Sequence, residues 1–182
     1  MFDFLKNGGI LWKDKHQPRR KGVGISAPTG YTIHHRKRRE DGGDDSDRNI
    51  SFVSAEHHQA WNLLFDRYPN EKVAFKLEKY WKKFGEGKAV LMARQIVLNL
   101  LESHQKSRRN KLFNSKSLRQ VINLTNINSK SEAKKLCAWI LLFDNLSLDE
   151  ILEICNKVWL DPDIEFFTKS KTAKISIRKK KN

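Results

Sequence analysis

The chain has 182 residues, and its 36 lysines and arginines against 21 aspartates and glutamates give it a formal net charge of +15. This excess indicates a polyanionic partner, most simply a nucleic acid; an anionic membrane surface and a basic protein without such a partner are the alternatives. Two cysteines without a C-x-x-C pair exclude a zinc knuckle and a disulfide framework, and no apolar run approaches the ~20 residues that span a bilayer.

The N-terminal segment, residues 1–29, is predicted to be an irregular basic arm, because it combines "KDKHQPRRKG" with the turn-forming "SAPTG". It lacks the basic start and continuous apolar stretch of a signal peptide. We therefore expect a cytoplasmic protein that does not enter a membrane.

Residues 30–66 are predicted to form a strand, a loop, a second strand and a helix. The β-prone runs "GYTIHH" and "ISFV" predict the strands, and the composition of "REDGGDDSDRN" predicts the loop that joins them. Ser54 fits the N-cap of the helix, with Glu56 in its first turn, and Trp61 begins its apolar face.

Residues 67–166 are predicted to be mainly α-helical. Amphipathic patterns cover 70–84 and 87–105, the latter apolar enough to predict a place in the centre of a core. Serine and glutamate at capping-box spacing, at 129 and 132 and again at 147 and 150, predict two further helix starts.

The C-terminal segment, residues 167–182, is a basic tail. Within it, 169–182 carries seven basic residues and no acidic one, so we expect disorder there. The fold class predicted for the whole chain is α+β, with a small hairpin and helix unit followed by a helical extension.

One internal similarity links 61–81 to 139–159. The two segments align without gaps at an offset of 78, and seven of 21 positions are identical, including W-x-LLFD and the closing tryptophan. A degenerate repeat of a helical hairpin and a chance likeness of two amphipathic pairs both explain this. Tryptophans within apolar helix patterns favour core packing over base stacking.

Four of the six histidines occur as two adjacent pairs on either side of the predicted loop, His34–His35 and His57–His58. Neutral imidazole is both a metal ligand and a usable general base. Neighbouring residues on a strand point to opposite faces, so His34 and His35 cannot easily share one metal ion. A further ligand is then expected from the helix, where His58 and Asn62 share a face and His57 is rotated by about 100°.

The spacing His34-His35-x13-Asn49-x8-His58-x3-Asn62, with Gly-Gly in the loop, resembles the HNH family of nucleases over roughly a fifth of the chain. The resemblance implies a ββα-metal fold, in which a hairpin clasps a helix over one divalent ion. It also implies that the partner is DNA and that the reaction is phosphodiester hydrolysis.

The resemblance further implies a role for each matching residue. His34 and His58 are metal ligands, His35 is the general base that deprotonates water, and Asn49 fixes the loop and orients the base. Asn62 stands where many family members have another histidine, and its amide is a possible ligand. The ion is Mg²⁺, Mn²⁺, Ni²⁺ or Zn²⁺, and a site without a protein carboxylate favours a transition ion.

Several alternatives stay open within the motif. His57 is expected to face solvent or phosphate, although it is a possible ligand in place of His58. Four basic residues follow the His34–His35 dyad: Arg36, Lys37, Arg38 and Arg39. They either hold DNA phosphates or form a generic basic patch. The aspartates at 44, 45 and 47 are read as a solvated loop, since they lack the oxygen spacing of a calcium loop.

Two functions therefore remain. The first is a metal-dependent DNA endonuclease that uses one metal ion and a histidine base. The second is a DNA- or RNA-binding protein with a degenerate HNH motif that does not cut. A surface histidine-rich hairpin without chemistry is the separate alternative to any role for the motif.

Overall fold

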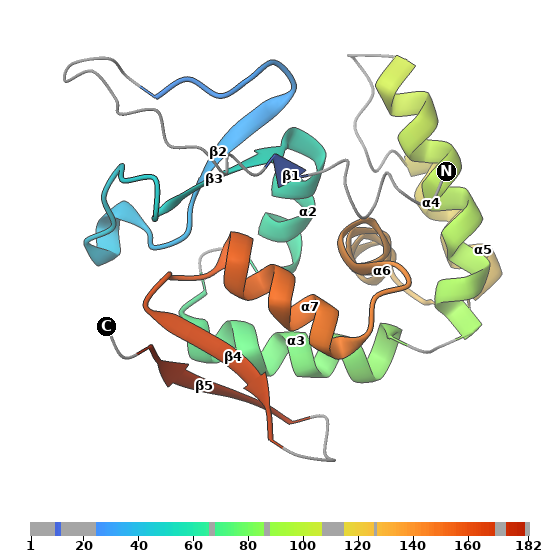
Figure 1. Cartoon of the computed structure of the whole chain (residues 1–182). Helices are drawn as coiled ribbons and strands as arrows, with labels where there is room; N and C mark the ends of the chain where they lie inside the picture. The colour runs from blue at the N-terminus through green and yellow to red at the C-terminus, as the bar shows by residue number, and fades with distance from the viewer. Residues whose placement is uncertain are drawn as a thin grey trace. The chain divides into compact units, whose positions relative to one another are not determined.

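The computed structural model describes residues 10–11, 25–65, 68–85, 88–106, 115–125, 127–169 and 174–180 (Figure 1). The chain divides into two compact units. The first unit comprises Met1–His58 and Leu146–Asn182, and the second comprises Gln59–Asn145. Helices and two small antiparallel sheets occur together, so the predicted α+β class is confirmed.

The sheet that carries the histidine dyad lies in the first unit. Strand β2 (Tyr31–His35) pairs antiparallel with β3 (Ile50–Ser54), in the register Tyr31↔Ser54 to His35↔Ile50. Both strands agree with the sequence prediction. A two-residue strand, β1 (Ile10–Leu11), pairs with the other edge of β3, which gives the order β1-β3-β2.

Strand β1 corrects the prediction that all of 1–29 is irregular; most of that segment lies outside the described residues. The unpaired N–H and C=O groups at the edge of β3 explain the pairing, because a short apolar dipeptide can satisfy them despite its basic surroundings.

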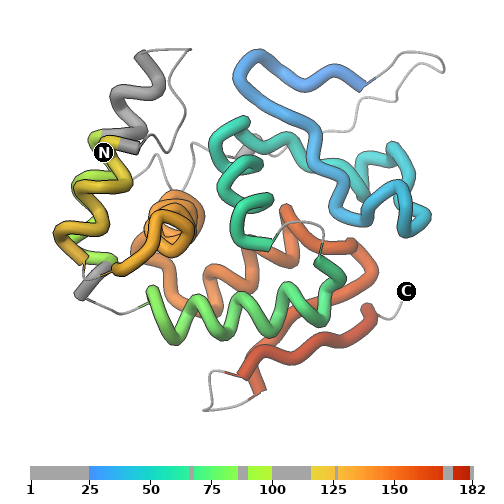
Figure 2. Tube along the Cα trace, turned by 180° about the vertical axis from the view of Figure 1, so that it is seen from behind, coloured from blue at the N-terminus to red at the C-terminus, as the bar shows by residue number. Residues whose placement is uncertain are grey.

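The loop between β2 and β3 folds tightly beyond the ends of the two strands (Figure 2). It contains a 3-10 turn at Arg39–Asp41, which ends at Gly42 with φ +82°. A Cβ added at Gly43 would overlap the carbonyl oxygen of Lys37. The double glycine is therefore required by the loop itself, by the left-handed backbone at the first glycine and by the close approach at the second.

Helix α2 (Ala55–Phe65) starts directly after β3. The Ser54 hydroxyl accepts a hydrogen bond from the backbone N–H of His57 at 3.2 Å, which confirms the predicted N-cap. The helix begins in the first unit and continues into the second.

The C-terminal part of the first unit begins with α7 (Leu148–Ile154), whose capping box between Ser147 and Glu150 is present as predicted. The helix continues as a π-helical segment, η2 (Cys155–Trp159). Strands β4 (Ile164–Thr168) and β5 (Ile175–Lys179) then form an antiparallel hairpin (Figure 1).

Strand β5 corrects the prediction of a disordered tail. The run "ISIRK" alternates apolar and polar residues, which suits a half-buried strand, and its Ile175 is buried. Arg178 also donates to the Glu165 carboxylate on β4 at 2.9 Å, which offsets part of the positive charge. Alternation thus outweighs the charge density that predicted disorder.

The second unit consists of helices α3 (Asn70–Phe84), α4 (Lys88–Lys106), α5 (Ser115–Thr125) and α6 (Lys130–Phe143), together with the end of α2. Helix α6, seen nearly end-on in Figure 1, is buried at every position from Leu136 to Phe143. The predicted central helix, α4, instead exposes Leu91 and Met92, at 69% and 50%. The charge-poor C-terminal half of α6 is what occupies the core.

An aromatic cluster fills this core. Trp139 lies edge-on to Phe143, with ring centroids 4.9 Å apart, and Tyr80 stacks on Phe84 at 5.7 Å. Such contacts add to the burial of each ring. The cluster explains why the predicted face of α3 is buried, apart from the half-buried Trp81.

The observed division differs from the predicted boundary between 30–66 and 67–166, because the chain after Asn145 belongs with the hairpin. The second copy of the internal similarity therefore runs from one unit into the other, whereas 61–81 lies in one. Trp139 and Trp159 are both buried, at 2% and 3% exposure, as core packing predicts. A duplication stays a prediction. Within the described residues, no helix has the length and apolarity needed to cross a bilayer.

Candidate active site

Two histidines far apart in the sequence meet in the first unit. Strand β2 presents His34, and the first turn of α2 presents His58. His34 Nδ1 lies 3.4 Å from His58 Nε2, and the two rings are edge-on, with centroids 5.2 Å apart. The structure thus brings together the two residues that the resemblance assigns to a metal ion.

The outer nitrogens of both rings are held by other groups. His34 Nε2 donates to the backbone carbonyl of Trp159 at 3.0 Å, and His58 Nδ1 lies 2.8 Å from the Thr32 hydroxyl. A carbonyl oxygen only accepts, so the neutral His34 ring carries its proton on Nε2 and presents a lone pair at Nδ1. Outer hydrogen bonds of this kind are typical of histidines that bind metals.

The tautomer of His58 depends on the single hydroxyl proton of Thr32. If that proton goes to the Val53 carbonyl, 3.3 Å away, His58 donates from Nδ1 and its Nε2 lone pair faces that of His34. If it goes to His58 instead, Nε2 donates to His34 across 3.4 Å, which is longer than an ordinary hydrogen bond. Only the first tautomer turns two lone pairs toward each other across the gap, and it is the one suited to a cation shared by the two nitrogens.

The separation of the facing nitrogens fits a metal ion. Two imidazole nitrogens bound tetrahedrally at about 2.0–2.1 Å lie about 3.3–3.4 Å from each other, and the observed distance is 3.4 Å. Burial lowers the pKa of His34 to about 4 and lowers that of His58, so both rings stay neutral at neutral pH, as ligands must.

Within the described ranges, the His34–His58 pair is not joined by a third ligand of the usual kinds. Among the residues that the structure describes, no group of three or more histidine, cysteine, aspartate or glutamate side chains is arranged to hold a metal ion. Asn62 is exposed on α2, one turn beyond His58. The pair accordingly offers two protein ligands, and further positions would be left to water or phosphate.

His57 differs from the sequence-based expectation. It was expected to face solvent or phosphate, but it is buried at 7% exposure, and its Nδ1 lies 2.6 Å from the Ser54 hydroxyl. Burial lowers the pKa of His57. It is packed beside the N-cap rather than beside His34. Of the two histidines at the start of α2, His58 is therefore the one that contacts His34.

His35, the last residue of β2, lies among charged groups. Its Nε2 is 2.8 Å from Oδ1 of Asp45 and 3.3 Å from Nε of Arg39. Arg39 also donates to both Asp45 oxygens, at 2.7 and 2.9 Å. The side chain of His35 is 22% exposed, so solvent reaches the ring.

Asn49 holds the two ends of the loop together. Its Oδ1 accepts from the Lys37 backbone N–H at 2.6 Å, and its Nδ2 donates to the carbonyls of Lys37 and Asp44 at 2.9 and 2.7 Å. The side chain is 3% exposed, and every one of these bonds is to backbone. This geometry matches the loop-fixing part of its expected role.

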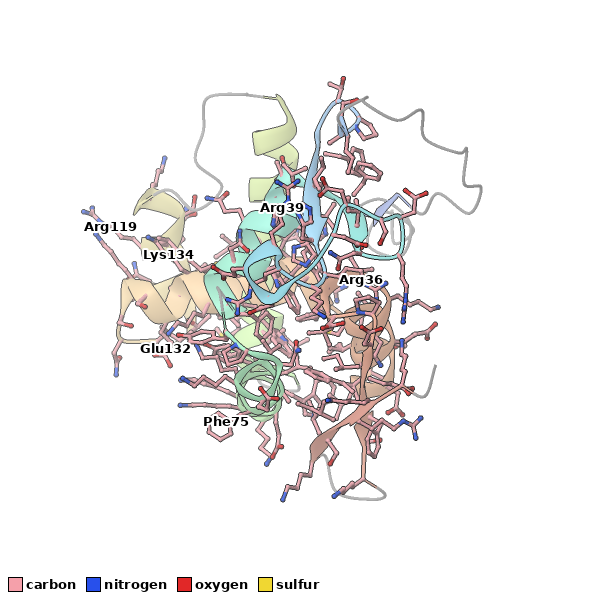
Figure 3. The ribbon with its side chains drawn as sticks, turned by 90° about the vertical axis from the view of Figure 1, so that its left-hand side faces the viewer. Arg36, Arg39, Phe75, Arg119, Glu132 and Lys134 are labelled. Carbon is pink, nitrogen blue, oxygen red and sulfur yellow. The ribbon has the colours of Figure 1, made fainter. Side chains whose placement is uncertain are left out.

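Arg36 differs from the expected phosphate contact. Its guanidinium donates to the carbonyls of Leu160, Asn156 and Arg48 at 3.0, 2.5 and 3.1 Å. Together with His34 it donates to carbonyls at and just beyond the end of η2, where a helix no longer supplies its own N–H donors. Arg36 is therefore a structural clamp, and Figure 3 shows it beside that segment.

The other three basic residues stay near the surface. Arg38 pairs with Glu40 and Asp41 at 2.8 and 2.5 Å, and Arg39, labelled in Figure 3, is 68% exposed. Lys37 contributes its backbone to the Asn49 clasp. Arg39 is the most exposed of the three, and the half-buried Lys37 and Arg38 lie on the same loop.

Sequence reasoning missed Thr32, Trp159 and Asp45 as partners of the histidines. Thr32 was detectable, because it shares the His34 face of a strand at i, i+2. Trp159 lies 125 positions from His34 and contributes a carbonyl, for which side-chain patterns carry no signal. Asp45 belonged to a run of aspartates whose composition predicted only solvation.

Comparison of the chain with models of known protein families, with curated proteins and with solved structures finds no match in any of the three.

Proposed function

We propose that the protein is a metal-dependent endonuclease that hydrolyses phosphodiester bonds of DNA. The observation that carries the proposal is the pairing of His34 and His58 across 3.4 Å, with outer nitrogens held by Trp159 and Thr32. Support also comes from the accessible His35 and the resemblance of the motif to HNH nucleases. The net charge of +15 favours a polyanionic substrate.

His34 and His58 would hold one divalent ion, which when bound supplies positive charge for the phosphate and the leaving oxygen. His35 accepts a proton from a water molecule, and the resulting hydroxide forms a bond to phosphorus while the ester oxygen leaves and is protonated by solvent. Asn49 keeps the loop closed while this occurs, and Arg38 and Arg39 neutralise flanking phosphates.

A second function is favoured by one observation: the described residues gather two imidazoles and no third histidine, cysteine or carboxylate ligand. A site with so few protein ligands suits a DNA- or RNA-binding protein that retains the fold of a nuclease without its activity. The residues of the proposed nuclease site would then bind backbone phosphate without cleaving it.

Plasmid nicking tests the two functions against each other. Purified protein is incubated with supercoiled DNA, linear DNA and RNA in Mg²⁺, Mn²⁺, Ni²⁺, Zn²⁺ or EDTA. Cleavage that requires a metal and disappears in both His34→Ala and His58→Ala supports the endonuclease, with Gln59→Ala, the exposed neighbour on α2, as the matched control. Tight binding without cleavage in every metal would favour the non-catalytic function.

A further inference from the structure

We propose that Asp45 is the positioning residue of His35 and fixes the ring so that Nδ1 is the nitrogen that accepts a proton. The catalytic consequence depends on the proposed nuclease function; the positioning itself does not. Nothing in the sequence motif assigns a role to this aspartate, which stands in a run read as a solvated loop.

The direction of the hydrogen bond follows from the chemistry of its partners. An ionised carboxylate only accepts, so at 2.8 Å the proton between Asp45 Oδ1 and His35 Nε2 belongs to the ring. The neutral imidazole has one N–H, which leaves the Nδ1 lone pair for water. A carboxylate that orients one ring nitrogen while the other accepts a proton is a general arrangement for histidine bases.

Arg39 competes for the same ring nitrogen but supports the arrangement. Its Nε lies 3.3 Å from His35 Nε2, and a nitrogen that donates to Asp45 cannot also accept from arginine. The shorter contact to Asp45 prevails. Hydrogen bonds from His35 and then from Arg39 hold the pKa of Asp45 below its usual range, so the carboxylate is ionised.

The position of Asp45 is fixed from two sides. Arg39 Nη2 donates to both of its oxygens, at 2.7 and 2.9 Å. The preceding residue, Asp44, is tied to the buried Asn49 through its carbonyl at 2.7 Å, and its carboxylate accepts from the Ser46 hydroxyl at 2.6 Å. Asn49 therefore reaches the base through the loop: it holds the Asp44 carbonyl, and the next residue holds His35.

The bond is suited to function more than to stability. The Asp45 side chain is 50% exposed, and exposed ion pairs contribute little to the free energy of unfolding. Replacement of Asp45 should leave the fold intact while it frees the His35 ring, so the two effects can be separated by experiment.

The structural test uses nuclear magnetic resonance of full-length protein labelled with ¹⁵N-histidine, with the His35 signals assigned from His35→Ala. The wild type should show a His35 Nε2–H signal protected from exchange. The signal should be lost in Asp45→Ala, retained in Asp45→Glu, and retained in Asp47→Ala, which removes the same charge from the same loop. A wild-type ring protonated on Nδ1, or a signal unaffected by Asp45→Ala, would overturn the proposal.

The kinetic test uses the same variants. Single-turnover cleavage by Asp45→Ala at saturating DNA should fall about 10- to 100-fold, part of the roughly 10²–10⁴-fold that a general base contributes. DNA affinity should not fall, because the substitution releases Arg39 rather than removing it. Added formate should restore part of the rate, because a small carboxylate can enter the exposed site. A normal rate in Asp45→Ala, or a lowered rate that neither formate nor Asp45→Glu restores, would contradict positioning. If wild type does not cleave, the nuclease proposal fails, and the resonance experiment still decides the role of Asp45.

Discussion

The two histidines of the dyad are neighbours on one strand, yet they sit in opposite environments. His34 is enclosed by the ring of Trp159, at a centroid distance of 5.0 Å, and by His58, and its outer nitrogen is held by a backbone carbonyl. His35 is held by the exposed Asp45 and flanked by an arginine. The alternation of a strand delivers both environments from two adjacent residues.

The difference shows how one residue type can serve two purposes. Burial keeps an imidazole neutral and rigid, which suits a ligand. A solvent-accessible ring held by a carboxylate suits proton transfer, because it can exchange its proton with water after each turnover. The comparison predicts that changes on one side of β2 alter metal binding and stability, whereas changes on the other alter rate.

The largest effect is expected from His35→Ala. Cleavage should fall by roughly 10²–10⁴-fold, the usual contribution of a general base, while metal affinity and DNA affinity persist because His34 and His58 are untouched. Single-turnover kinetics and calorimetry with Zn²⁺ and Mn²⁺ measure the two properties. Loss of metal binding in His35→Ala would show that His34 and His35 both belong to the metal site, and the separate roles assigned to them would be wrong.

The next effect concerns pH and the buried face. The unfolded chain protonates His34 near pH 6.5, but the folded protein resists protonation until about pH 4, because burial opposes the charge. The unfolded state therefore binds more protons between these values, and stability falls as the pH falls from 6.5 to 4. The shift is equivalent to about 3 kcal/mol, and the lowered pKa values of His57 and His58 act in the same direction.

Urea unfolding in EDTA at pH 7.5, 6.0 and 5.0 measures this dependence. His34→Gln removes the titrating ring while it keeps a donor for the Trp159 carbonyl, so its stability should change less with pH. Equal pH dependence in the variant and the wild type would mean that the folded protein does not lower the pKa of His34.

A smaller effect is expected from Thr32→Val, which keeps the shape of the side chain and removes the hydroxyl that holds His58. Loss of such an outer partner typically lowers metal affinity about 10- to 100-fold. The exchange of the His35 ring proton should not change, because Thr32 lies at the His34 face of β2. Calorimetry and the histidine resonances of one sample give both values, and a change in both would show that the two faces are coupled.

Patterns in the local sequence predicted the strands and helices of this site better than they predicted the hydrogen-bond partners of its side chains. Strands β2 and β3, the N-cap at Ser54 and the bounds of α3 followed from alternation, capping chemistry and helical spacing, which are properties of neighbouring residues. The meeting of His34 with His58 followed from the motif. These features depend on interactions over a few tens of residues at most.

The misassigned residues depend on distant parts of the chain. Arg36 looks like a phosphate ligand in "HHRKRRE", but it lies beside the end of η2, where carbonyls 120 and 124 positions away lack helical partners. The first unit consists of two segments that the second unit separates in the sequence, and this division likewise depends on contacts between distant parts of the chain. Strand β5 was missed for another reason. The many basic residues of its segment indicated disorder, and the alternation of apolar and polar residues was given less weight.

The smallest effect concerns the exposed cations beside His35. Arg38 and Arg39 each pair with loop carboxylates, and exposed pairs of this kind add little stability. If they contact DNA, each alanine substitution should make the slope of log K against log[salt] shallower by about 0.9. Arg36→Ala is the contrasting variant: it removes the same charge, but its guanidinium donates to three backbone carbonyls, so unfolding by urea should become easier while the salt slope stays close to that of the wild type. Binding titrations across a range of KCl concentrations measure the slopes. If Arg36→Ala flattened the slope as much as Arg39→Ala did, Arg36 would leave its carbonyl partners to contact DNA. The assignment of Arg36 to structure and of Arg39 to the substrate would then be wrong.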